Sequence, residues 1–248
     1  NDTQSNAPPR LDGLVFGDGS NFATVQYGHT FEKIGSFVGT IQYHNYGDFF
    51  YSDETGFVDD SQFSVSDYAV NLGWGRRLND NLSIGANLKF AGIQYENNST
   101  FALAVDVSGT YRTKSDWIMS LTARNIGAEL YNNYQGYKNK LPFRTQFGVS
   151  KKLEHLPFTV IVVYDNIQKW DLSYDDPLDL EGNYDPMAGQ YIEKSKLDRF
   201  AKNLFSHIVF AGELNLGKNL FIRLGYDYGF RQNMKTPTKK GAVGLSYG

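Results

Sequence analysis

Two acidic stretches without lysine or arginine are the first places where this sequence could do chemistry. Residues 47–66 and 171–185 hold eleven of its 27 acids, and hard cations such as Ca²⁺ bind several carboxylate oxygens. The spacing matches no EF-hand, so solvated loops are the simpler interpretation and a bound divalent cation is the alternative. These acids are Asp48, Asp53, Glu54, Asp59, Asp60, Asp171, Asp175, Asp176, Asp179, Glu181 and Asp185.

The four histidines indicate no comparable site. His29, His44, His155 and His207 form no pair at metal-ligand spacing. Ser206 precedes His207, but nothing else in the sequence completes a hydrolase site around that pair. No glycine-rich phosphate loop and no cysteine are present. We therefore expect a protein that is not an enzyme, with no catalytic residues, no metal site and no resident cofactor.

The composition favours long strands joined by turns. The chain has 248 residues, 15% aromatic residues, 25 glycines and only 7 prolines. The longest apolar run, 160–164, is far shorter than the about 20 residues of a membrane-spanning helix. Its net charge of −3 argues against a nucleic-acid partner, because such binders are usually basic.

Alternation with a period of two is the dominant pattern. Ile84, Ala86, Leu88 and Phe90, for example, interleave with polar or small residues. The pattern predicts about twelve strands, most of about ten residues, the length at which strands cross an outer membrane. We expect them at 22–30, 35–46, 67–77, 83–90, 101–108, 116–125, 142–152, 157–168, 206–215, 219–228 and 241–247, with a weaker one at 11–17.

The connections between these strands alternate in length, except that the turn at Asn97-Asn98 is short where a long loop is due. Short ones lie at 32–33, 78–81, 113–115, 153–156 and 216–218, and long ones at 47–66, 126–141, 169–205 and 229–240. Short turns at one end and long loops at the other are typical of outer-membrane barrels. We therefore predict an all-β fold over 1–248, a single antiparallel up-and-down transmembrane barrel in contact with a lipid bilayer. A soluble sandwich or lipocalin-like barrel is the alternative.

The polar side of the alternation carries charges that we assign to the barrel lumen. With Asn97-Asn98 as a two-residue turn, Lys89 falls opposite Asp106. The same reasoning about a turn near residue 217 makes Glu213 and Arg223 diagonal neighbours. We expect a cross-linked network that closes the pore. Its members are Lys89, Asp106, Arg124, Arg144, Glu213, Arg223 and Asp227.

One helix is expected within the loop at 169–205. Leu197, Phe200, Ala201 and Leu204 recur at helical spacing, and Ser195 with Asp198 makes a capping pair. We expect this apolar stripe to pack on the barrel rim. Aromatic residues gather near the strand ends, as interfacial girdles do, and Phe49, Phe50, Tyr51 and Trp170 are candidate anchors for a partner.

Longer segments carry a resemblance to a known family. They are 27–49 (YGHTFEKIGSFVGTIQYHNYGDF), 67–90 (DYAVNLGWGRRLNDNLSIGANLKF), 123–130, 141–158 (LPFRTQFGVSKKLEHLPF), 166–174 and 217–235 (GKNLFIRLGYDYGFRQNMK). Through them the chain resembles the PorQ family of the type IX secretion system, FadL-like outer-membrane barrels related to PorV. The likeness covers nearly everything after residue 21 and consists of scaffold patterns, not catalytic signatures.

The resemblance implies a function at the surface of a Gram-negative cell. Members of the family are thought to hold the surface protein PorZ, within the attachment complex where PorV carries cargo to the sortase PorU. The long acidic loops would then be the docking face. The resemblance also implies a missing N-terminal segment and last strands, and a complete barrel of about fourteen strands.

Two other functions stay open. A FadL-like transporter of hydrophobic small molecules would need an apolar pocket and an opening in the barrel wall. A member of the related PorP/SprF group would need its partners at the end with the short turns.

Overall fold

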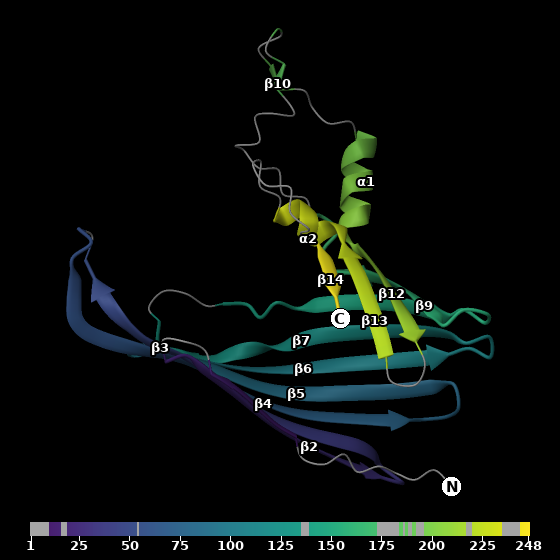
Figure 1. Ribbon diagram of the computed structural model, residues 1–248, viewed down its shortest axis with the longest axis horizontal. Coiled ribbons are helices and arrows are strands. Elements are labelled where there is room, and N and C mark those ends of the chain that lie inside the picture. Colours follow the sequence, from purple (N-terminus) through teal and green to yellow (C-terminus); the bar gives the residue numbers. More distant parts are fainter. Residues whose placement is uncertain are drawn as a thin grey trace. The chain divides into compact units, whose positions relative to one another are not determined.

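The computed structural model describes residues 10–15, 19–53, 55–134, 139–172, 184–185, 187, 190–191, 196–216, 220–234 and 244–248. Its main sheet has twelve strands within these ranges, and they follow one another in chain order (Figure 1). Every pairing whose register is defined is antiparallel. The predicted all-β class and up-and-down order are therefore confirmed.

The strands have the following bounds. They are β1 (Arg10–Val15), β2 (Asn21–Phe31), β3 (Gly35–Ser52), β4 (Val58–Arg77), β5 (Leu82–Tyr95), β6 (Asn98–Arg112), β7 (Trp117–Asn132), β8 (Arg144–Lys152), β9 (Phe158–Asp165), β12 (Ile208–Leu216), β13 (Leu220–Asp227) and β14 (Leu245–Tyr247). The short strands β10 (Tyr184–Asp185) and β11 (Gln190–Tyr191) pair only with each other. The helices are α1 (Lys196–Ser206) and α2 (Tyr228–Asn233).

The chain divides into two compact units, residues 1–109 with 122–143, and residues 110–121 with 144–248. In the first unit the ladder from β2 to β5 places residues of the same polarity side by side. Ile41 lies between Val25 and Val70, and Leu72 lies opposite Leu88. The next row on the other face is polar: Gln26, Thr40, Asn71 and Lys89. The register therefore separates an apolar face from a polar one.

The apolar face of this sheet is accessible. Ile41 and Leu72 are 58% and 57% exposed, and many of their apolar neighbours on the strands are also exposed. Among the described hydrophobic residues, only Val65 and Ala104 are buried. A water-soluble domain buries Val, Ile, Leu and Phe preferentially, so this sheet lacks the core that such a domain requires.

The strands are longer than predicted at the end where long loops were expected. The predicted loop at 47–66 is wrong, because β3 and β4 continue through it as a hairpin, in which the Asp53 N–H donates to the Phe57 carbonyl at 3.0 Å. Phe49 pairs with Phe63 there, and their rings stack 5.6 Å apart. β7 likewise runs to Asn132, into the predicted loop at 126–141. Cross-strand aromatic contacts of this kind let a ladder continue.

The turn between β5 and β6 lies one residue earlier than predicted. It occupies Glu96 and Asn97, and Glu96 has a positive φ of 54°. A shift of a two-residue turn by one position moves every partner by two residues, which keeps each side chain on its face. Lys89 and Asp106 therefore share a face, as predicted, but as diagonal neighbours.

In the second unit, β8, β9, β12, β13 and β14 pair in sequence, and both helices lie at the same end of β12 and β13 (Figure 1). The predicted helix is confirmed as α1, but its stripe is not packed as expected. Leu197 and Phe200 are exposed, whereas the buried residue of α1 is Asn203. Ser195, the predicted cap, lies outside the described residues. The predicted loop at 229–240 is also wrong at its start, where α2 forms.

A close approach between β6 and β7 makes Gly127 sensitive to substitution. A Cβ at this position would overlap the backbone of Leu103 and lie 2.7 Å from the Ala104 Cα atom. We expect Gly127→Ala to lower the free energy of unfolding by about 1–3 kcal/mol, since neither strand can yield locally.

Gly109→Ala is the matched control, because a Cβ at Gly109 has no heavy atom within 4 Å. We expect it to change stability by less than about 0.5 kcal/mol. Guanidinium unfolding of the detergent-solubilised protein measures both values. Equal unfolding midpoints for the two variants would contradict the close packing of β6 on β7.

Candidate functional site

The first charged cluster of the polar face joins β5, β6 and β7. Lys89 Nζ lies 2.6 Å from Asp106 Oδ1, so the predicted ion pair is present. The sequence analysis missed its third member, Asn125, whose backbone N–H donates to Asp106 Oδ1 at 2.8 Å and whose side-chain oxygen accepts from Lys89. Asn125 has a φ of 58° within β7. Asparagine tolerates this left-handed conformation better than most residues, and that is the only signal the sequence offered.

The second ion pair belongs to the other unit and has an unpredicted partner. Arg144 Nε donates to Asp165 Oδ1 at 2.7 Å, and a terminal guanidinium nitrogen contacts the second carboxylate oxygen. This is a bidentate pair, and charge-assisted hydrogen bonds of this kind are about twice as strong as those between neutral groups. Asp165 is only 4% exposed, so Arg144 neutralises a buried charge at the end of β9.

The third ion pair is the one predicted between β12 and β13. Arg223 Nε donates to Glu213 Oε2 at 2.6 Å. The two residues face each other directly, so the predicted diagonal arrangement is wrong. The hairpin closes with Leu216 opposite Leu220, which moves the centre of the turn toward the C-terminus. The Arg223 side chain is 64% exposed, which marks this pair as a surface contact.

The last two predicted members of the network have other roles. Asp227 caps α2, because its carboxylate accepts from the Phe230 N–H at 2.8 Å. Arg124 lines a pocket on the polar face of the first unit. Among the predicted lumen charges, Lys89 thus pairs with Asp106, Glu213 with Arg223, and Arg144 with the unpredicted Asp165.

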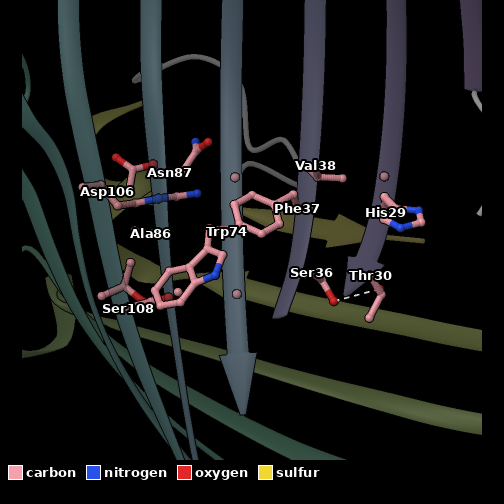
Figure 2. A pocket seen from close by; sticks show the side chains of 16 residues that line it. His29, Thr30, Ser36, Phe37, Val38, Trp74, Ala86, Asn87, Asp106 and Ser108 are labelled. Carbon is pink, nitrogen blue, oxygen red and sulfur yellow. Dashed lines mark hydrogen bonds between the residues drawn. The ribbon is translucent and has the colours of Figure 1, made fainter. Parts of the chain in front are cut away.

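The pocket beside Arg124 measures about 600 Å³ and is shown in Figure 2. Asn87, Asp106 and Ser108 contribute polar side chains from neighbouring strands. Gly73 and Gly85 leave room at its floor; a Cβ on Gly85 would lie 3.0 Å from Ser108 Oγ. Phe37, Val38 and Trp74 also line the pocket, and Asp106 in it is already engaged by Lys89.

A second pocket, of about 440 Å³, is more apolar. Ala69, Ala91 and Ile93 contribute to its lining, together with Phe22 and His44. The Phe22 and His44 rings meet edge to face at 5.8 Å. This pocket has the composition that a small hydrophobic ligand requires.

His207, Asn203, Tyr164 and Trp170 form a cluster, which we call the buried corner, that holds the segment after β9 in place. His207 is fully buried, with Nδ1 2.7 Å from the Asp165 carbonyl oxygen and Nε2 2.9 Å from the Trp170 carbonyl oxygen. The His207 ring stacks on Tyr164 and Trp170 at 5.0 and 5.6 Å. Asn203 also donates to the Trp170 carbonyl, at 2.6 Å.

Ser206 and His207, the adjacent pair noted in the sequence, have separate hydrogen-bond partners here. The Ser206 hydroxyl donates to the Lys202 carbonyl of α1 at 2.8 Å, and both nitrogens of His207 are occupied by carbonyl oxygens. The buried corner positions Trp170, a predicted docking residue that is half exposed and also packs against Phe200. Asp171 follows it and is exposed. Asp175, Asp176 and Asp179 lie outside the described residues.

The other predicted docking residues occupy the β3–β4 hairpin. Phe49 and Phe50 are exposed, and Phe57 in the turn is 71% exposed. Tyr51 donates to Glu96 Oε1 at 2.6 Å. Asp48, Asp59 and Asp60 are exposed along the strands, whereas Glu54 lies outside the described residues.

The acidic side chains of the hairpin serve its own backbone. The Asp53 carboxylate accepts from the Thr55 N–H and hydroxyl and from the Phe57 N–H, and Asp59 accepts from Ser61. The side-chain hydrogen bond from Thr55 is the main cause that lowers the pKa of Asp53. Within the described part of the chain, no three acidic or histidine side chains are arranged to hold a metal ion.

No protein-family model matches this chain, and a search of the curated proteins found no match. No helix within the described ranges is long and apolar enough to cross a membrane.

The two arginine pairs predict unequal costs of substitution. Arg144→Met leaves the buried Asp165 without its cation, so we expect a loss of about 3–5 kcal/mol in the free energy of unfolding. Arg223→Met removes an exposed pair and should cost about 0–1 kcal/mol. Parallel denaturant titrations measure both, and a cost for Arg223→Met equal to that for Arg144→Met would contradict this ranking.

The Asp53 turn predicts a pH dependence at the hairpin tip. The folded-state pKa of Asp53 lies below its unfolded value, so the turn is stabilised fully above the unfolded pKa. That stabilisation is lost as the pH falls through the lowered folded pKa. The Thr55 and Phe57 amide signals in NMR spectra should therefore shift at a pH below the ordinary aspartate range. A midpoint within that range, or a signal unchanged by Asp53→Asn, would count against this turn.

Proposed function

We propose that this protein is an outer-membrane β-barrel that holds a protein partner at the cell surface. The observation that carries the proposal is the exposed apolar face of the β2–β5 ladder. At about 25 cal/mol per Å² of apolar surface, leaving several such side chains per strand in water is unfavourable. A lipid bilayer would cover this face without a second protein layer.

The polar face supports the same proposal. Lys89, Asp106 and Asn125 form a hydrogen-bonded cluster on it. Facing lipid, charged groups on strands are costly, whereas a lumen accepts them. The proposed barrel is FadL-like with about fourteen strands, and its short turns lie on the periplasmic side.

We further propose that the barrel belongs to the type IX secretion system, as a PorQ-like component of the attachment complex. The support is the sequence resemblance over 27–49, 67–90 and 141–158, together with an exposed aromatic and acidic hairpin suited to docking. The proposed partner is a surface protein of the PorZ type, in contact with the PorU and PorV sortase assembly. In this role the protein binds and positions, and it performs no catalysis.

Replacement of the hairpin tip tests this function in cells. Exchanging 48–64 for an Asn-Gly turn keeps the membrane strands and removes Phe49, Phe50 and the tip acids. We expect the barrel to remain in the outer membrane while the surface partner is released and cargo attachment fails. Shortening 171–196 tests the second predicted docking loop in the same way.

The control variant changes the opposite end of the sheet, Asp80→Lys in the β4–β5 turn. It should leave partner retention unchanged. If both tip variants assemble and still retain the surface protein and normal attachment of cargo, the docking function is wrong.

The apolar pocket supports one other function, a FadL-like transporter of hydrophobic small molecules. Ala69→Trp and Ala91→Trp would fill this pocket, because both residues line it. If these variants abolish uptake of a fluorescent fatty acid while the hairpin replacement has no effect on uptake or on attachment, transport replaces docking as the function.

A further inference from the structure

The β3 strand has an open edge beyond the point where β2 stops. The first residue of β2, Asn21, pairs with Asn45, and none of the described strands pairs with β3 on that side after it. β3 continues to Ser52, paired on its other side with β4. Unpaired N–H and C=O groups of a strand edge are a template for another strand.

This edge is regular over its last five residues. The ladder between β3 and β4 has one extra β3 residue between Asn45 and Asp48, where Gly47 has a φ of 88°. The second irregularity, between Phe50 and Ser52, adds residues on the β4 side. Asp48–Ser52, which we call the open edge, is therefore a continuous extended segment without proline or lysine.

The opposite side of the hairpin is braced by β5. The Glu96 N–H donates to the Ser64 carbonyl at 3.3 Å, just beyond the last β4–β5 pair. Tyr51 donates to Glu96, and the Phe63 and Tyr95 rings lie 5.1 Å apart. These contacts support the hairpin from the β5 side, and no described strand pairs with the open edge on the side away from β4.

The side chains of the open edge define what would bind there. Phe49 and Tyr51 share one face with Phe63, and Asp48 and Phe50 lie on the other. From residue 34 to residue 75 the sequence contains no lysine or arginine, although it has six acidic residues. An added strand would therefore meet the rings of Phe49 and Tyr51 on one face, and the negative charge of Asp48 beside the Phe50 ring on the other.

We propose that the open edge takes up an extended segment of the surface partner as an additional β-strand. The matching segment alternates apolar residues, which contact Phe49 and Tyr51, with lysine or arginine, which faces Asp48. Main-chain hydrogen bonds supply affinity in this binding mode, and alternate side chains supply specificity. The inference rests on the proposed function, because it describes how that partner docks.

Peptide binding to the full protein in nanodiscs tests the inference. The probe is a fluorescein-labelled eight-residue peptide of alternating valine and lysine, measured by fluorescence anisotropy. Two further peptides carry N-methyl groups on the odd or on the even amides. Because alternate residues of a strand direct their N–H groups to the same side, only one methylated peptide should lose binding, by about tenfold or more.

Charge variants complete the test. Asp48→Lys should weaken the parent peptide by about threefold or more, whereas Asp80→Lys, with the same change in net charge, should not. Equal binding of both methylated peptides, equal loss by both, or no binding of the parent peptide would overturn strand addition.

The outcomes separate this inference from the proposed function. If tip replacement releases the surface partner but the methylated peptides do not differ, docking stands and strand addition fails. If one methylated peptide alone loses binding but tip replacement leaves the partner attached, the edge binds strands and the proposed function fails.

Discussion

The separation of apolar from polar side chains across one hydrogen-bonded ladder determines most of this structure. Each pairing from β2 to β5 places apolar residues such as Ile41 and Leu72 on one face and residues such as Thr40 and Asn71 on the other. A shift by one residue would reverse both faces at once. The polar contacts of Lys89, Asp106 and Asn125 depend on this register, since they form only when the three strands hold it.

Buried polar groups lie at the end of β9, where the chain leaves the sheet, and beside the start of β12, where it returns. Asp165 ends β9, pairs with Arg144 and, through its carbonyl oxygen, contacts His207. His207 in turn contacts the Trp170 carbonyl, which Asn203 also holds. A buried histidine and carboxylate are costly unless each is hydrogen-bonded. In this structure both groups are hydrogen-bonded. Their contacts hold the segment that follows β9, so that Trp170 lies beside α1.

The sequence was sufficient for the class and order of the sheet because a period of two is a local property. It also placed α1. It identified the Lys89–Asp106 and Glu213–Arg223 pairs, because a turn displaced by one position shifts each partner by two residues and keeps each side chain on its face. It failed where tertiary contacts decide. Aromatic pairing extended β3 and β4 through a segment rich in aspartate and glycine, which local propensity assigns to a loop. The partner of Arg144 was missed because Asp165 lies on the next strand, in a register that only the folded hairpin defines.

The contact of the apolar face with lipid is the central claim, and alternation of quenching along β4 tests it most directly. The chain has no cysteine, so Val70→Cys, Asn71→Cys and Leu72→Cys can each carry a single bimane label. In vesicles that contain nitroxide-labelled lipids, strong quenching is predicted at 70 and 72 and weak quenching at 71. Equal quenching at all three positions, or stronger quenching at 71, would contradict the account.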